Sequence, residues 1–172
     1  MKEQTERAGQ PEVVLRAAKV PDAEAVHALA SELAEALGDS PPKPAAVRER
    51  LGELLEAPGA GVLVAEVEGE VVGVVSYWIK PDLAHGDSVV EIPMLAVSEG
   101  YRRGGVGRAL LAAVTERASE ADAALVELVA TPSNVAAREF YRSLGFVETD
   151  HIVLEFVGEI EDLPDVIEDS VD

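Results

Sequence analysis

The sequence predicts an α/β domain built on a mixed β-sheet with helices on both faces. Two observations indicate this class. Some segments repeat apolar residues with the period of a helix, whereas others form short apolar runs bounded by turn residues, as strands do. After residue 98 the two kinds of segment alternate, and helical connections of this kind place parallel strands in a sheet. The predicted order is strand, helix, helix, three strands, helix, strand, helix and strand.

The chain is long enough for one domain with one core. It has 172 residues, of which 48% are hydrophobic, so disorder is excluded for the bulk of the chain. Residues 1–11 are predicted to be a disordered N-terminal lead, and residues 12–157 to form the domain. Residues 158–172 carry seven acidic residues and no basic one, which predicts a mobile acidic tail.

The first part of the domain is predicted to contain one strand and two helices. The apolar run at 13–18 forms the strand. Asp22 is positioned to cap the first helix, and Gly38 to end it in a left-handed conformation. The buried face of this helix is predicted to comprise Val26, Leu29, Ala30, Leu33 and Leu37. The second helix ends at Pro58, and its apolar face comprises Val47, Leu51, Leu54 and Leu55.

The remaining strands come from the rest of the domain. Glu68 and Gly69 separate two apolar segments, which predicts a hairpin. The next strand contains Pro93, which cannot donate a hydrogen bond to a neighbouring strand, so a bulge or a sheet edge is expected there. The predicted strands are 61–67, 70–79, 89–97, a buried strand at 124–130 and a last strand at 146–157. The predicted helices run from the glycine-rich turn to about residue 118 and from 134 to 144.

The composition excludes several classes of function. The formal net charge is −19, so binding of nucleic acid through a basic surface is not expected. The acidity could steer cationic substrates, or it could be an adaptation of solubility, for example to a high-salt cytoplasm. The chain has no cysteine, which excludes disulfides, thiolate zinc sites and a cysteine nucleophile. Its three histidines lack the spacing of metal ligands.

The sequence also carries no membrane or export signal that we recognise. The N-terminal residues include no apolar segment of the kind found in signal peptides. No run approaches the roughly 18 consecutive apolar residues that a membrane-spanning helix needs. We therefore expect a soluble, cytoplasmic protein without a membrane partner.

A glycine-rich turn carries the strongest functional signal. It lies between a predicted strand and a predicted helix and consists of Arg102, Arg103, Gly104, Gly105, Val106, Gly107 and Arg108. Backbone N–H groups in such a turn can converge on one point, and the helix N-terminus adds the positive end of its dipole. The arginines reinforce this preference for an anion in an otherwise acidic chain. The alternative is an ordinary helix start whose glycines contact no ligand.

Two common phosphate-binding motifs do not fit this turn. The P-loop requires Gly-Lys followed by Ser or Thr at the start of the helix, and the turn has no such sequence. The dinucleotide-binding fingerprint requires a third glycine, whereas Gly107 is followed by Arg108-Ala109-Leu110. The turn therefore indicates an anionic ligand of another kind.

The turn and a second motif resemble the GNAT superfamily of N-acetyltransferases. Arg102-x-x-Gly105-x-Gly107 matches the Gln/Arg-x-x-Gly-x-Gly/Ala pattern that binds the pyrophosphate of coenzyme A in that family, and the segment from Asn134 to Phe146 is similar to its C-terminal motif. The resemblance covers about residues 12–157. It implies a mixed, mostly antiparallel sheet with splayed central strands, acetyl-CoA as co-substrate and no metal. It also implies direct transfer of acetyl to a primary amine in a ternary complex.

The resemblance further implies roles for individual residues. Glu91 is the candidate general base, because it interrupts an apolar strand similar to the one that carries the glutamate base of histone-acetylating members; a solvent-facing glutamate is the alternative. Tyr141 is the candidate general acid that protonates the CoA thiolate; a core aromatic residue is the alternative. Asn134 would bind or orient CoA near the thioester, or simply cap a helix. The segment expected to line the pantetheine arm is Leu95, Ala96 and Val97, with the backbone of Leu95 and Val97 pairing with the arm.

The sequence does not identify the acceptor, which could be a small molecule, a protein N-terminus or a lysine. In the family the two N-terminal helices and the loop at 81–87 usually shape its pocket. The residues that could line this pocket, or belong to the core instead, are Tyr77, Trp78, Asp82 and His85. A non-catalytic acetyl-CoA-binding sensor or partner-docking module is the alternative function, and a homodimer is one assembly that the domain could form.

Overall fold

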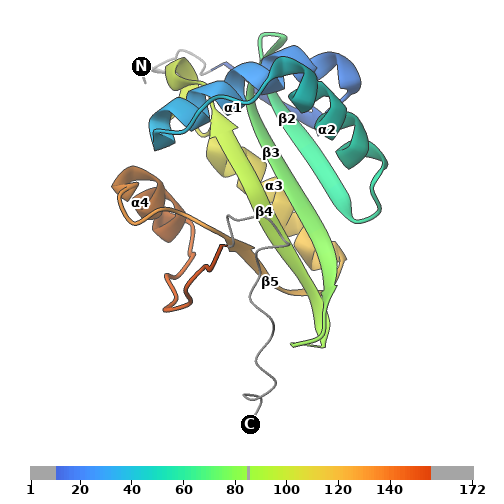
Figure 1. Cartoon of the computed structure of the whole chain (residues 1–172), viewed down its shortest axis with the longest axis vertical. Helices are drawn as coiled ribbons and strands as arrows, with labels where there is room; N and C mark the ends of the chain where they lie inside the picture. The colour runs from blue at the N-terminus through green and yellow to red at the C-terminus, as the bar shows by residue number, and fades with distance from the viewer. Residues whose placement is uncertain (1–10, 85, 156–172) are drawn as a thin grey trace, which may run out of the picture.

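The computed structural model describes residues 11–84 and 86–155. They contain a five-stranded sheet in the order β1-β2-β3-β4-β5 (Figure 1). The strands are β1 (Val13–Ala17), β2 (Ala60–Val67), β3 (Glu70–Asp82), β4 (Asp87–Val97) and β5 (Ala123–Leu128). Neighbours pair antiparallel from β1 to β4, and β4 pairs parallel with β5. The predicted mixed, mostly antiparallel sheet is confirmed.

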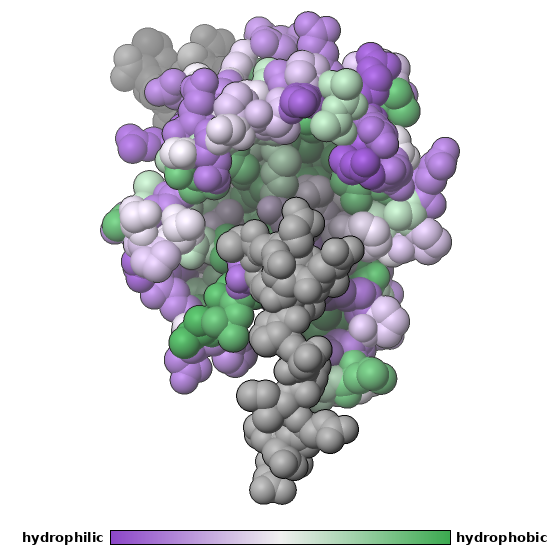
Figure 2. Space-filling view, in the orientation of Figure 1, coloured by the Kyte–Doolittle hydropathy of each residue, from purple (hydrophilic) through white to green (hydrophobic). Residues whose placement is uncertain are grey.

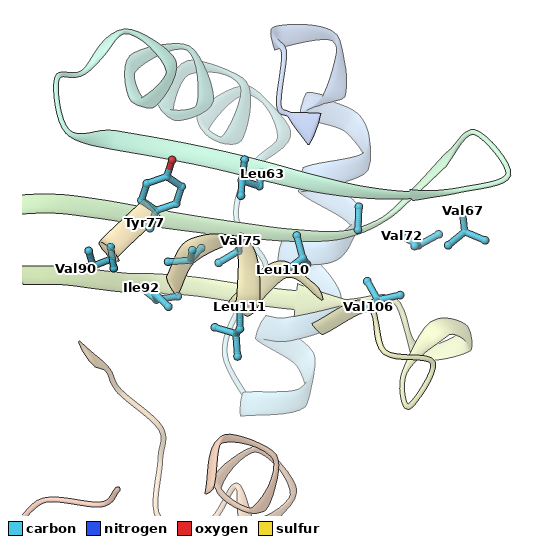
Figure 3. Packing of buried hydrophobic residues seen from close by; sticks show 13 residues of the cluster. Leu63, Val67, Val72, Val75, Tyr77, Val90, Ile92, Val106, Leu110 and Leu111 are labelled. Carbon is cyan, nitrogen blue, oxygen red and sulfur yellow. The ribbon is translucent and has the colours of Figure 1, made fainter. Parts of the chain in front are cut away.

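Helices cover both faces of this sheet, as predicted. They are α1 (Ala23–Leu37), α2 (Pro44–Glu56), α3 (Val106–Glu120) and α4 (Val135–Ser143). Successive side chains of a strand point to opposite faces, so β2 contributes Val62 and Val64 to a core under α1 and α2, and Leu63 to a second core against α3. Figure 3 shows this second core, in which Leu110 of α3 lies beside Val75 of β3.

Two local predictions at chain reversals are confirmed. Gly38 follows α1 with φ +78°, the left-handed conformation that favours glycine. Glu68 and Gly69 join β2 to β3 with φ values of 53° and 84°. Positive φ at both central residues is the geometry whose twist suits a two-residue hairpin.

Three predicted details of the N-terminal helices are wrong. Asp22 does precede α1, but its carboxylate accepts a hydrogen bond from the backbone N–H of Lys19 at 2.7 Å and pairs with Arg16, so it does not cap the helix with its side chain. Leu37 and Leu55 are 41% and 37% exposed. Each lies in the last turn of its helix and outside the core that α1 and α2 form with the sheet.

The predicted irregularity at Pro93 is a bulge in β4. Ser76 of β3 lies opposite Met94, whereas Trp78 lies opposite Glu91. Two residues of β4, Ile92 and Pro93, therefore stand against the single residue Tyr77 of β3, and the strand bends there. Pairing between β4 and β5 also ends at this level, with Ile92 opposite Leu128. Beyond it β5 has ended, whereas β4 continues to Val97, so this end of β4 has no described strand beside it on that side (Figure 1). The predicted splay of the central strands stays a prediction.

The predicted last strand at 146–157 is wrong over the residues that the structure describes. Residues 146–155 form no strand, and Phe156 and Val157 lie outside the described residues. Val147, Ile152 and Leu154 are more than four-fifths exposed, and Figure 2 shows hydrophobic side chains gathered over the segment that follows α4. Apolar composition predicts strand propensity, but a strand also requires a hydrogen-bonded neighbour.

The strand predicted to be buried at 124–130 is corrected for the same reason. Within the described residues β5 is the edge of the sheet, and none of its side chains is fully buried. The predicted acidic tail at 158–172 and residues 1–10 of the predicted lead lie outside the described residues. In the part of the chain that the structure describes, no helix combines the length and the apolar character that crossing a membrane requires.

Candidate functional site

The glycine-rich turn leads from β4 into the N-terminus of α3. Arg103 and Gly105 both have positive φ, 63° and 87°, and Gly105 is the residue that precedes the helix. The helical hydrogen bonds begin with the N–H of Ala109, which donates to the carbonyl oxygen of Gly105 at 2.9 Å. The N–H groups of Val106, Gly107 and Arg108 therefore have no acceptor within the helix. They point out of its positive end, which is a suitable site for an anion.

The backbone at Gly107 is closely packed. A Cβ atom there would lie 3.2 Å from Cζ of Phe140 on α4 and 3.7 Å from Cγ2 of Val97 on β4. The start of α3 is thus wedged between β4 and α4. Val106 is buried in the core beside it. At Gly104 a Cβ would approach the carbonyl oxygen of Tyr101 to 3.3 Å, so the turn itself is also tightly folded.

The three arginines of the turn have different environments. Arg102 donates from Nε to the carbonyl oxygen of Val97 at 3.0 Å, and its guanidinium lies 3.7 Å from the carboxylate of Glu32 on α1. It therefore fastens the turn to the end of β4. Arg103 and Arg108 are exposed, and neither forms an ion pair with another described residue. Their positive charge is available to a ligand.

The end of β4 offers free backbone groups beside the turn. The N–H of Ser98 donates to the carbonyl oxygen of Val72 on β3 at 2.9 Å. Because hydrogen-bonding direction alternates along a strand, Ala96 also pairs toward β3, whereas Leu95 and Val97 direct their N–H and C=O groups to the opposite edge. β5 ends at Leu128, opposite Ile92, so no described strand pairs with this edge at Leu95 and Val97.

The three residues predicted to line the pantetheine arm therefore differ in which of their groups can reach it. Leu95 and Val97 present backbone groups to the gap, although the carbonyl oxygen of Val97 already accepts from Arg102. Ala96 is 7% exposed and its side chain packs in the core beneath α1. The free edge extends from Val97 to Ile92, about 17 Å at 3.3 Å per residue, and connects the glycine-rich turn to Glu91.

Glu91 lies one residue before the end of the pairing between β4 and β5. Val90 and Ile92 point into the core against α3, so Glu91 between them points to the other face. It stands level with Glu127 of β5, and its carboxylate forms an ion pair with Nζ of Lys80 on β3. Its side chain is 43% exposed. Glu91 is thus solvent-facing, as the alternative reading expected, but it is also paired with a cation.

The ion pair acts on the ionisation of Lys80. The hydrogen bond to Glu91 is the largest cause and raises the pKa of Lys80. Burial, the next largest, opposes it, and the negative charges of Glu91, Glu127 and Asp82 raise the pKa further. Lys80 therefore keeps its proton and stays beside the carboxylate. The other charged groups that act on Lys80, Glu127 and Asp82, are acidic as well.

Tyr141 belongs to an aromatic cluster on α4. Its ring lies 5.4 Å from that of Phe140 and 5.7 Å from that of Phe146, between ring centroids. Burial raises the pKa of the Tyr141 hydroxyl, so the group holds its proton more firmly than a free tyrosine. The packing expected of a core aromatic residue is present. A role in proton transfer stays a prediction.

Asn134 makes the contact expected of a helix cap. Its Oδ1 accepts a hydrogen bond from the N–H of Ala137 at 3.1 Å, at the start of α4. A contact of Asn134 with CoA stays a prediction. At the other end of this region Arg138 and Arg142 both pair with Glu148 at 2.8 Å, which holds the segment after α4 against the helix.

Two of the residues suggested for the acceptor pocket, Tyr77 and Trp78, lie on opposite faces of the sheet. Tyr77 is 6% exposed and lies in the core against α3, so it does not line a pocket. Trp78 points to the other face and lines a hollow of about 300 Å³ under α2, together with Arg50, Glu53, Leu54 and Ala57. Trp78 also lies directly opposite Glu91. His85 lies outside the described residues.

The sequence and the fold are both similar to those of known proteins. The sequence profile of the Acetyltransferase (GNAT) family matches residues 24–146. The chain belongs to this family. The matched region includes the glycine-rich turn, the end of β4 and the whole of α4.

Several relatives of this GNAT chain are named as N-acetyltransferases. It is 32% identical over 139 residues to the aminoalkylphosphonate N-acetyltransferase of Salmonella typhimurium, a match that covers 81% of this chain and 88% of that protein. It is 36% identical over 106 residues to the N-acetylaspartate synthetase of Xenopus tropicalis, but this match spans only 58% of the chain and 36% of the relative. The structure of aminoglycoside N-acetyltransferase AAC(6')-Iy in complex with CoA superimposes with a TM-score of 0.75 at 21% identity, over 87% of this chain and 97% of that one.

Sequence reasoning missed two charged neighbours in this GNAT site. Lys80 and Glu127 flank Glu91 on the adjacent strands. The hairpin between β3 and β4 places Asp82 opposite Asp87, and that register puts Lys80 within side-chain reach of Glu91. Register is the signal that could have found Lys80. Glu127 becomes a neighbour only through the parallel pairing of β4 with β5.

Proposed function

We propose that the chain is an acetyl-CoA-dependent N-acetyltransferase that transfers acetyl directly to a primary amine in a ternary complex. One observation carries the proposal: the unpaired edge of β4 runs from the anion-binding N-terminus of α3 to a carboxylate, Glu91. A long, narrow thioester with an anionic end fits such a path. The CoA bound to the GNAT protein AAC(6')-Iy supports this choice of ligand.

The turn would bind the pyrophosphate of the cofactor. The free N–H groups at 106–108 would donate to phosphate oxygens, and Arg103 and Arg108 would contribute positive charge. Both features stand out in a chain with a net charge of −19, which would otherwise repel an anion. The backbone of Leu95 and Val97 would then hold the pantetheine arm along β4, in the manner of an added strand.

Glu91 would remove the proton that prevents the amine from attacking. Holding a lysine-like amine neutral at pH 7 costs about 4.6 kcal/mol, from its ordinary pKa near 10.4. A carboxylate at the site of attack lowers this barrier by accepting the proton. Because Glu91 is half exposed, the proton can pass on to solvent. The amine nitrogen then attacks the thioester carbonyl, and the C–S bond breaks.

Tyr141 would protonate the departing thiolate. The aromatic cluster around it excludes water from the ring, and the raised pKa keeps the hydroxyl protonated at neutral pH. The hydroxyl therefore still carries its proton when the C–S bond breaks. No step of this scheme requires a metal.

Acidic groups around Glu91 favour a cationic acceptor. Glu127 of β5 is level with Glu91, and Asp82 lies opposite Asp87 where β3 ends and β4 begins. Their combined field would concentrate polyamines or basic peptides at this face, whereas an anionic amine would be repelled. The proposal therefore differs in acceptor from the Salmonella relative, whose name specifies an aminoalkylphosphonate.

Two measurements test this function. Calorimetric titration with acetyl-CoA should give a saturable heat of binding. A thiol-detection assay should then show CoA release with a panel that includes a polyamine, a basic peptide, an aminoglycoside, aspartate and an aminoalkylphosphonate, with the cationic amines reacting fastest. Binding without turnover on any amine would favour a non-catalytic acetyl-CoA sensor, and absence of binding would refute the phosphate assignment.

A further inference from the structure

The ammonium of Lys80 lies against the carboxylate that we assign as the general base. Lys80 is on β3, and its side chain crosses to β4, where Nζ forms a hydrogen-bonded ion pair with Oε2 of Glu91. The chain has four lysines, and three of them, Lys19, Lys43 and Lys80, are in the described part. Among these three, Lys80 is the lysine whose side chain pairs with a carboxylate.

This position is the one that an acceptor amine would have to reach. In direct transfer the acceptor ammonium donates its proton to Glu91 and then attacks the thioester. The Nζ group of Lys80 is a primary amine that already donates a hydrogen bond to that carboxylate. Glu91 also lies one residue before the end of the pairing between β4 and β5, so it stands at the end of the path assigned to the thioester arm.

We propose that Lys80 is an internal acceptor, and that the protein acetylates this residue when acetyl-CoA is bound and no external amine is present. The inference rests on the proposed function, since it requires acetyl-CoA in the assigned site. It adds a modification site within the chain itself. It also assigns a purpose to a lysine that the reaction with an external amine does not use.

The chemistry balances without a further reactant. The Lys80 ammonium gives one proton to Glu91, which passes it to solvent, and the neutral Nζ attacks the acetyl carbon. The new C–N bond forms as the C–S bond to CoA breaks. The second proton of the nitrogen goes to the thiolate, so the products are an amide at Lys80, CoA with a free thiol and one released proton.

Acetylation would change the site electrostatically. An acetylated lysine carries no charge, so the ion pair with Glu91 is lost. Glu91 and Glu127 then lie level with each other on adjacent strands, and Glu91 no longer has a cation paired with it. We expect the modified protein to bind cationic acceptors with an altered KM.

The test uses the full chain and acetyl-CoA without an acceptor. Peptide mass spectrometry follows acetylation at each lysine with time. Lys80 should react at least about tenfold faster than the exposed Lys19 and Lys43, because it is held beside the base and the bound donor. Its rate should not depend on protein concentration, and excess free CoA should slow it without slowing Lys43.

Matched variants separate this reaction from surface chemistry. Lys80→Arg keeps a positive charge beside Glu91 and should abolish the fast phase, whereas Lys43→Arg should leave it unchanged. Equal rates at the three lysines, or no protection by CoA, would overturn the inference. A rate that rises with protein concentration would show transfer between molecules and would also overturn it.

The outcome is distinguishable from failure of the proposed function. CoA release with an external amine, together with unmodified Lys80, would refute the internal acceptor alone. Absence of any heat on titration with acetyl-CoA would refute the function and the inference together.

Discussion

The guanidinium of Arg102 donates from Nε to the carbonyl oxygen of Val97, at 3.0 Å, and so closes the glycine-rich turn onto the end of β4. Arg108, six residues along the chain, is exposed and lies in the first turn of α3. The two arginines of one motif therefore have separable effects. One holds the turn in place, and the other is free to contact a ligand.

Substitution of these arginines should separate folding from cofactor affinity. Arg102→Ala removes the hydrogen bond and should lower the free energy of unfolding by about 1 kcal/mol as well as weaken acetyl-CoA binding. Arg108→Ala should weaken acetyl-CoA binding with little change in stability. Urea denaturation and calorimetric titration measure the two quantities. If Arg108→Ala bound acetyl-CoA normally, its charge would have no part in the phosphate site.

The turn should also be sensitive to loss of a glycine. At Gly105 φ is +87°, which costs an L-residue about 1–2 kcal/mol, so Gly105→Ala should destabilise the protein by about that amount. Gly52 in α2 is a matched control, because no atom lies within 4 Å of the added Cβ. Gly52→Ala should stabilise by up to about 1 kcal/mol through helix propensity. Thermal unfolding of both variants checks the opposite signs, and a stabilised Gly105→Ala would contradict the assigned turn geometry.

Glu91→Gln should slow turnover while acetyl-CoA affinity stays the same. Loss of a general base typically lowers kcat by about 10²–10⁴. The deficit should be larger at low pH than at high pH, because an acceptor amine loses its own proton as the pH rises. A pH profile of kcat for the wild type and the variant measures this difference.

Glu127→Gln is the matched control for the base. It alters the neighbouring carboxylate on the same face, which does not carry the hydrogen bond from Lys80. We expect its effect to fall mainly on KM for cationic acceptors and to weaken with added salt. Equal losses of kcat in the two variants, or a pH profile unaffected by Glu91→Gln, would remove Glu91 as the base.

An ion-pair network at the start of the domain should make stability depend on acid pH. Arg16 bonds to Asp22 at 2.7 and 2.8 Å and to Glu66 at 2.8 Å, and these groups are mostly buried. The hydrogen bond from Arg16 lowers the pKa of Asp22 below its ordinary value near 3.9, with a further contribution from the N–H of Lys19. The pair therefore stabilises the folded state above about pH 4 and loses this effect as the pH falls through the lowered pKa.

Asp22→Asn should expose this dependence. At pH 7 the variant should lose about 1.5–3 kcal/mol of stability, the range for a hydrogen bond to a charged group, and much less at pH 2. Glu53→Gln breaks the exposed pair with Arg50 and should leave stability nearly unchanged at either pH, because solvent screens such a pair. Urea titrations at the two pH values decide the outcome. A pH-independent loss for Asp22→Asn would show that packing, and not charge, is what Asp22 provides.

Much of the fold was predictable because local chemistry determined it. The hairpin at Glu68 and Gly69, the end of α1 at Gly38 and the bulge at Pro93 all appear where the sequence placed them. Each depends on a property of one or two residues: tolerance of positive φ, or the absence of an N–H. The turn into α3 was predictable for the same reason.

Other features depend on which segments meet. Residues 146–155 have the composition of a strand but form none, because no described strand pairs with them. Arg102 was expected to face the ligand with Arg103 and Arg108, yet it contacts Val97 and Glu32. Neither result follows from the local pattern of residues.

The sequence by itself determined the periods of its helices and strands, the sites of its turns and the glycine-rich turn before α3, because these follow from side chains and φ angles close together in the chain. Only the tertiary structure decided the partners of its charged groups. The register between β3 and β4 brings Lys80 to Glu91, and the parallel pairing with β5 brings Glu127 beside them. Such contacts depend on the alignment of separate strands, which no single segment of sequence specifies.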